Sequence, residues 1–189
     1  MKKILVPALA IISLFAVSCN NDAEKTDSTE TATNINEAKE DSNKVDNDAE
    51  TAVAFADGGM MEVKLGQLAQ TNGTNASVKE LGKMMEMDHG KAGEELKAWA
   101  AKYNVTLPVV LGNDAQKTYD DLAAKKGADF DKAYAEMMVD DHEKDIKKFK
   151  DEADNGKNAE LRTWAMGKLP VLQHHLDMSK QTWEAVKGK

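Results

Sequence analysis

The sequence predicts an all-α protein, an up-and-down four-helix bundle with one extra short helix. Residues 51–189 divide at clear turn signals into segments rich in Ala, Lys, Glu, Leu and Met, with few β-branched residues, a composition that favours helix throughout. Four of these segments are long, and brief connections between long helices are typical of antiparallel neighbours. Each long segment also has an apolar face that is interrupted by one polar residue.

Residues 1–19 predict an export signal that ends at the only cysteine of the chain. Two lysines precede an apolar stretch of 14 residues, 4–17, which is too short for a spanning helix of about 20 residues. The string Phe-Ala-Val-Ser-Cys that ends at Cys19 resembles a bacterial lipobox, in which the cysteine carries lipid and becomes the mature N-terminus. The alternative is a secreted protein with an unpaired cysteine. We expect a lipid anchor at Cys19 in the outer membrane, with the protein facing the periplasm or displayed on the surface.

Residues 20–50 predict a disordered acidic tether. From 21 to 50 the chain has ten acidic residues and three lysines, and almost no apolar side chain other than alanine, Ile35 and Val45. Such a segment buries too little surface to offset the entropy lost on ordering. The tether carries −7 of the net charge of −8, so the acidic pI says little about the partners of the domain. The sequence has no basic patch that would indicate binding to nucleic acid.

Residues 51–189 predict one domain of five helices, near 49–71, 77–103, 113–125, 129–154 and 158–186. Asn-Gly pairs separate the first two and the last two, and Pro108 lies in the connection after the second. Ser77-x-x-Glu80 is the pattern of a capping box that opens the second helix.

A repeated motif, Met-Met-x-x-Asp-His-x-Lys, occurs at residues 84–91 and again at 137–144, 53 residues later. It places two of the four histidines of the chain at equivalent points of two helices. The repeat predicts one supersecondary unit used twice, with a polar group on its core-facing side.

The polar residues that interrupt the four apolar faces are the candidate functional residues. Residues three or four apart share one face of a helix, and on these faces the exceptions are Glu62, His89, His142 and His175. His174 points about 100° away from His175 and is expected to face solvent. In an antiparallel layout all four lie toward the middle of the bundle, within about two turns of one another.

Three imidazoles and one carboxylate in an apolar interior have the composition of a metal site. One zinc, copper or iron ion is the expected cofactor, and the nearby Met85 and Met138 favour copper slightly. The alternative is a buried polar network in which Glu62 and water satisfy the histidines without an ion. The adjacent Asp88 and Asp141 could hydrogen-bond the ligands or face solvent.

A carboxylate-bridged di-iron centre is disfavoured, because it needs Glu-x-x-His on two helices. Glu86-x-x-His89 provides one, but Val139 and Leu172 stand three residues before the other histidines.

Several motifs in one order resemble a known family, domain of unknown function 4142. The resemblance covers roughly residues 50–184 and implies a ferritin-like helical bundle in a bacterial envelope protein of the outer membrane, with no assigned activity. It implies that the four candidate residues occupy recurrent polar positions of the family. The motifs are residues 56–70, Met85-x-x-Asp88-His89, Pro108, Phe130-Asp131-x-x-Tyr134, Met138-Val139-x-Asp141-His142 and Leu169-Pro170-x-Leu172-x-x-His175-Leu176.

The sequence has no nucleophile–base motif, phosphate-binding glycine loop or redox cysteine pair. We therefore expect a non-enzymatic envelope protein that binds a metal ion or another envelope component. A mononuclear metal-dependent enzyme is one alternative, and a purely structural or interaction bundle with a buried Glu/His network is the other.

Overall fold

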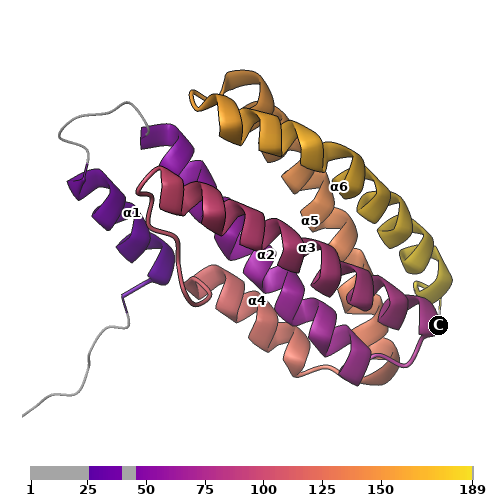
Figure 1. Cartoon of the computed structure of the whole chain (residues 1–189). Helices are drawn as coiled ribbons and strands as arrows, with labels where there is room; N and C mark the ends of the chain where they lie inside the picture. The colour runs from indigo at the N-terminus through magenta and orange to yellow at the C-terminus, as the bar shows by residue number, and fades with distance from the viewer. Residues whose placement is uncertain (1–25, 40–45, 189) are drawn as a thin grey trace, which may run out of the picture.

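A computed structural model describes residues 26–39 and 46–188, and over these residues the chain is all-helical (Figure 1). The prediction of an all-α protein is confirmed, and the five expected helices agree with five observed ones to within three residues at each end. No helix in this part of the chain is long and apolar enough to cross a membrane. The helices are α1 (Ser28–Ala38), α2 (Asp46–Asn72), α3 (Ala76–Lys102), α4 (Asn113–Ala123), α5 (Gly127–Asn155) and α6 (Ala159–Val186).

Helix α1 and the start of α2 lie inside the segment expected to be disordered, which corrects that expectation for residues 28–38 and 46–50. Asp27 caps the helix by accepting from the Thr29 amide at 2.7 Å, and it also accepts from the Asn113 amide at 2.7 Å. Asn36 pairs with the backbone of Thr106 through both ends of its amide, at 2.6 and 2.9 Å. The ordering entropy is offset by these hydrogen bonds to the connection between α3 and α4, which composition alone does not show.

The four long helices form two antiparallel hairpins, α2–α3 and α5–α6, which pack against each other (Figure 1). The N-terminal end of α5 lies beside the turn that opens α3, because Asp131 accepts from the Thr74 amide at 2.9 Å. Helices α3 and α5 therefore run in the same direction, and α4 returns the chain between them. The expected up-and-down connectivity is wrong at this point, since α4 is a crossover rather than an appendage.

Each hairpin turn is held by a buried aspartate from the other hairpin. Asp131 accepts from the amides of Thr74 and Asn75, both at 2.9 Å, and from the Thr74 hydroxyl. Asp48 accepts from the amides of Lys157, at 2.9 Å, and Asn158. The two aspartates stand 83 residues apart in the sequence.

The turns themselves repeat with the same spacing. Both read Asn-Gly-x-Asn, at residues 72–75 and 155–158, and in both the last asparagine caps the following helix. The structural unit used twice is thus a hairpin with an 83-residue period, not the 53-residue motif expected from the sequence. Asn75 caps α3 by accepting from the Ser77 amide at 2.9 Å, so the expected capping box at Ser77 is also corrected.

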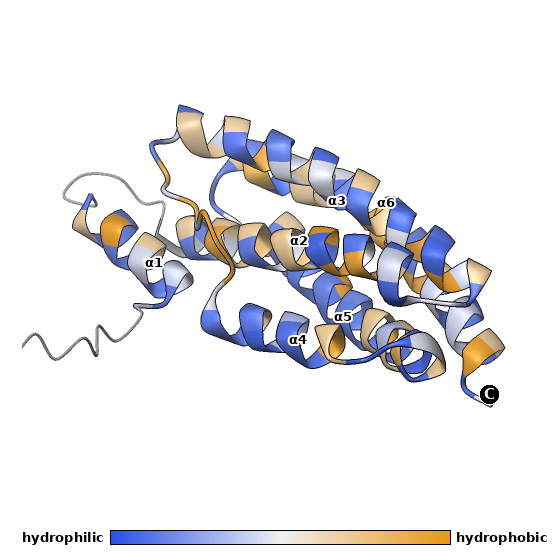
Figure 2. Ribbon diagram, turned by 90° about the horizontal axis from the view of Figure 1, so that it is seen from below, coloured by the Kyte–Doolittle hydropathy of each residue, from blue (hydrophilic) through white to orange (hydrophobic). Residues whose placement is uncertain are grey.

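The interior has two apolar clusters with a polar layer between them. One cluster includes Leu65, Met85 and Phe130, and the other includes Phe55, Leu96 and Leu172. At the first end, α2 and α3 approach closely, because a Cβ on Gly82 would lie 2.7 Å from the backbone oxygen of Gly66. At the other end, the strongly hydrophobic connection after α3 crosses α2 (Figure 2).

Candidate metal centre

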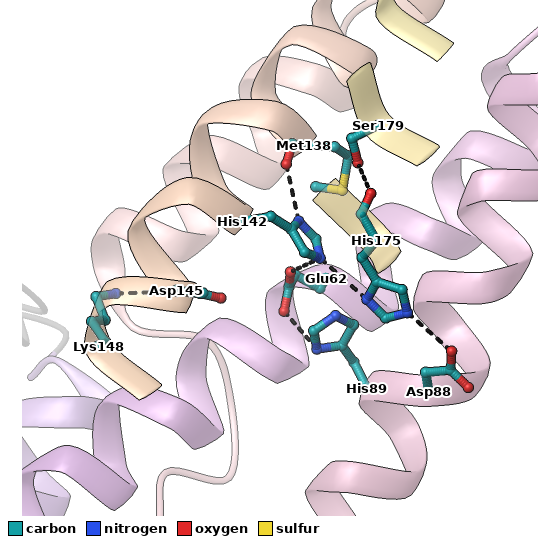
Figure 3. A network of polar contacts seen from close by, with 9 residues as sticks. All are labelled: Glu62, Asp88, His89, Met138, His142, Asp145, Lys148, His175 and Ser179. Carbon is teal, nitrogen blue, oxygen red and sulfur yellow. Dashed lines mark hydrogen bonds and ion pairs between the residues drawn. The ribbon is translucent and has the colours of Figure 1, made fainter. Parts of the chain in front are cut away.

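The four residues singled out in the sequence lie together in the polar layer, one from each long helix (Figure 3). Glu62 comes from α2, His89 from α3, His142 from α5 and His175 from α6. The most exposed of them is His89, at 8%. His174, the neighbour of His175, is exposed, as expected.

Backbone geometry assigns the proton of His142. Its Nδ1 lies 2.9 Å from the carbonyl oxygen of Met138, one turn earlier in α5. A carbonyl only accepts, so Nδ1 carries the hydrogen of the neutral ring. The other nitrogen, Nε2, therefore presents a lone pair to the interior.

A carboxylate assigns the proton of His175 in the same way. Its Nε2 lies 3.0 Å from Oδ2 of Asp88, which leaves a lone pair on Nδ1. That Nδ1 is 3.3 Å from Nε2 of His142. Two lone pairs face each other at this distance, and a hydrogen bond between them would require one imidazole to be doubly protonated.

His89 and Glu62 complete the arrangement. Nδ1 of His89 lies 2.7 Å from Oε2 of Glu62 and donates to it when Glu62 is ionised; Nε2 of His89 is then left with a lone pair, and that buried atom has no hydrogen-bond partner. The other carboxyl oxygen, Oε1, also has no hydrogen-bond partner and lies 3.5 Å from Nε2 of His142. Figure 3 shows the three rings turned toward one another around Glu62.

The three imidazoles each offer a ligand atom, and these atoms lie within 4.8 Å of one another. Two nitrogens bound at about 2.05 Å to a tetrahedral ion stand about 3.3 Å apart, which equals the separation of His142 and His175. Partners that fix each tautomer are typical of metal-binding histidines. The residues therefore could hold a metal ion.

Burial sets the protonation of the centre. It lowers the pKa of His89, His142 and His175 to about 4, because a charged ring would lose its hydration. The rings are neutral at pH 7 and so are able to bind a metal. Burial also raises the pKa of Glu62 to about 8, and the opposing effects of His142 and Lys148 are smaller. A bound ion would supply the charge that keeps this carboxylate ionised.

Two further carboxyl groups adjoin Glu62. Asp141 and Asp145 of α5 offer oxygens that lie within 4.8 Å of one another and of Glu62. Burial raises the pKa of both, that of Asp141 to about 8. Asp145 was missed in the sequence, although it stands three residues after His142 and thus on the same face of the helix.

Of the other residues considered in the sequence, Glu86 lies apart from the centre, whereas Met138 and Asp88 contact its histidines. Glu86 accepts from the side-chain amides of Gln67, at 2.9 Å, and Gln70, at 2.7 Å, on the face between α2 and α3. Met138 contributes its backbone carbonyl to His142. Asp88, left open between a hydrogen-bonding and a solvent-facing role, holds His175.

Comparisons with known proteins identify the family. Searches of curated proteins and of solved structures give no match to the chain. The family model described as a domain of unknown function, DUF4142, matches residues 32–182, which span the second half of α1 and nearly all of the five following helices. The chain belongs to the DUF4142 family.

Proposed function

We propose that this protein is a lipid-anchored envelope protein whose domain binds one metal ion through His89, His142 and His175, with Glu62 beside them. The observation that carries the metal is the set of three buried ring nitrogens that face one another with their hydrogens committed elsewhere. Without an ion, a hydrogen bond between His142 and His175 would need a second proton on one of the two rings, and burial opposes that proton by lowering both pKa values to about 4.

The ion joins all four long helices, because each supplies one of these residues. We propose that these helices form a ferritin-like four-helix bundle with a crossover connection. Zinc, copper and iron all suit imidazole and carboxylate ligands. A separation of 3.3 Å between two ring nitrogens fits tetrahedral coordination, which favours zinc or cuprous copper.

The envelope location rests on the N-terminal sequence. The short apolar stretch and the single cysteine at position 19 support a lipid anchor on the periplasmic side of the outer membrane, although residues 1–25 lie outside the described part of the structure. Without a recognisable nucleophile or redox pair, we propose a binding role rather than catalysis. The proposed partner is the membrane, which the protein contacts through the lipid anchor at Cys19.

Metal content and thermal melting of the full chain test the proposal. His175→Ala and His174→Ala form a matched pair, because the two histidines are adjacent but only His175 faces the centre. We expect wild type and His174→Ala to carry one ion per chain and to melt about 5–10 °C higher with ligand at about 100 times Kd than after chelation. His175→Ala should carry none.

The absence of metal binding would contradict the proposal. If the chelated wild type binds no zinc, copper or ferrous iron and none of them shifts its melting, the four residues form a buried polar network. The domain would then be a tethered structural or interaction module.

A further inference from the structure

A cavity lies directly beside the metal centre. It has a volume of about 400 Å³ and opens between α2 and α3 under the connection that contains Leu107 and Pro108. Cavities of this size lie within the range of small-molecule sites. Its walls are mainly apolar and include Phe55, Phe149 and Trp164.

Four glycines shape this cavity, two on each of the helices that enclose it. Gly58 and Gly59 of α2 and Gly90 and Gly93 of α3 line it, and a Cβ added at any of them would meet no atom within 4 Å. Glycine costs a helix roughly 0.5–1 kcal/mol relative to alanine. Local helix propensity therefore does not explain these residues, whereas the open space does.

The 83-residue period of the two hairpins shows which residues occupy the positions equivalent to those that line the cavity. Shifted by that period, Gly59 corresponds to His142, Ala92 to His175 and Asp145 to Glu62. The period also aligns the buried positions, since Ala52, Val78 and Leu96 correspond to the buried residues Ala135, Leu161 and Ser179.

The cavity is thus lined by three of the four residues that the 83-residue period makes equivalent to the residues of the metal centre. Gly59, Ala92 and Asp145 all line it, and the first two lack the imidazoles that fill the equivalent positions. The fourth counterpart, Leu172 for His89, is apolar and buried. Where one half places two rings against a carboxyl group, the other half leaves a carboxyl group facing open space.

The inner end of the cavity is formed by Glu62, His89 and Asp145. Glu62 and His89 are paired with each other, 2.7 Å apart, which leaves Asp145 as the acceptor at this end. Within the described part of the chain, Asp145 receives only one long contact, 3.5 Å, from the exposed Lys148. A molecule that enters must therefore bring a hydrogen-bond donor to this end and apolar surface to the rest.

We infer that the cavity binds a small, planar, largely apolar molecule of one or two rings that donates an N–H or O–H group to Asp145. This molecule takes the place that two imidazoles occupy in the equivalent half. The site is separate from the ion, because none of the three ring nitrogens that face one another is needed for it.

Binding of indole to the full chain tests this inference. Indole has two fused rings and one N–H, and 1-methylindole has the same rings without the donor. Gly59→Leu and Gly93→Leu fill the cavity at two independent points without a clash at Cβ. Gly167→Leu is the matched control, a helical glycine with equally open surroundings in α6 that does not line the cavity.

We expect saturable 1:1 binding of indole to wild type and Gly167→Leu, followed by calorimetry and ligand NMR, and at least tenfold weaker binding to both filled variants. 1-Methylindole should bind wild type at least tenfold more weakly than indole. The same results are expected after chelation and with zinc, so failure of the metal proposal leaves this test intact. Absence of saturable indole binding to wild type would overturn the inference, as would wild-type affinity in a folded Gly59→Leu or Gly93→Leu variant, or equal affinity for the methylated probe.

Discussion

At the scale of single residues, the centre is prepared by partners that fix where each proton lies. His142 is held by a backbone carbonyl of its own helix, which a side-chain substitution cannot remove. His175 depends on Asp88 of α3 and His89 on Glu62 of α2, so each contact also joins two helices. The orientation of the rings and the packing of the helices are therefore set by the same contacts.

The raised pKa of Glu62 predicts that the metal-free protein loses stability as the pH becomes alkaline. Its folded pKa is raised to about 8 from 4.5, so its stabilising contribution is fully present below pH 4.5 and is lost as pH rises through 8. Between pH 6 and 9 the free energy of unfolding should fall by about 2–3 kcal/mol from this group. Thermal melting of chelated protein at both pH values measures the fall.

The matched variants separate Glu62 from other carboxyl groups. Glu62→Gln should decline by about 2–3 kcal/mol less than wild type, while Asp141, whose pKa is also raised to about 8, keeps its own share; Glu86→Gln, at a surface carboxyl group, should decline as wild type does. Metal-loaded wild type should likewise lose the share of Glu62 from the decline, because the ion favours the ionised carboxylate. A Glu62→Gln profile identical to that of wild type would show that Glu62 does not titrate in this window.

Much of this site could be predicted from the sequence, because a period of three to four residues identifies the one polar side chain on each apolar face. That reasoning placed Glu62, His89, His142 and His175 in one layer. It did not identify Asp145 or the partner of each ring, because these depend on how far one helix is shifted and rotated against the next. It also left Asp88 undecided for the same reason.

At the scale of elements, the two hairpins are joined by reciprocal aspartates. Asp131 and Asp48 each accept hydrogen bonds from backbone amides of the opposite turn. These amides precede or open a helix, where no intrahelical acceptor is available. Removing the carboxylate leaves buried donors without partners.

Asp131→Ala and Asp48→Ala should each lower the free energy of unfolding by about 2–4 kcal/mol. Asp129→Ala, at an exposed position two residues from Asp131, should change it by no more than about 0.5 kcal/mol. Urea denaturation measures all three. Equal effects of Asp131→Ala and Asp129→Ala would show that the turn does not depend on this contact.

Helix α1 acts as a strap over the connection between α3 and α4. Asn36→Ala removes both hydrogen bonds to Thr106, and we expect the Thr106 amide to exchange its hydrogen at least tenfold faster, equivalent to about 1.4 kcal/mol of local protection. Asn34→Ala, two residues away on the exposed side of the same helix, should leave that exchange rate unchanged. Unchanged exchange in Asn36→Ala would mean that the strap is held by other contacts.

The strap also shows what the sequence hid at this scale. The polar composition of residues 21–50 predicts that they have no core of their own, but Asp27 with Glu30 three residues later is a helix-start pattern that composition conceals. The direction of α5 was missed because turn signals give the length of a connection and not which end of the domain it reaches. The two Asn-Gly-x-Asn turns would have revealed the period, but they are short and cannot be told from ordinary turn sequences.

At the scale of the whole molecule, the lipid anchor remains a prediction. Cys19→Ala should move the protein from the membrane fraction to the soluble fraction, because a single lipidation site would be lost. Asn21→Ala, just beyond the cysteine, should leave the distribution unchanged. Fractionation followed by immunoblotting measures both, and a membrane-bound Cys19→Ala protein would show that something other than this cysteine holds it.

The 83-residue period also has a consequence for the ancestry of the chain. Two hairpins that hold each other through equivalent aspartates, Asp48 and Asp131, and through Asn-Gly-x-Asn turns have the arrangement expected if two copies of one hairpin were joined in a single chain. A single ancestral hairpin would have met its twin across a two-fold axis, with two identical polar centres. In this chain one of the two sets of equivalent positions has the histidines, and the other lines the cavity.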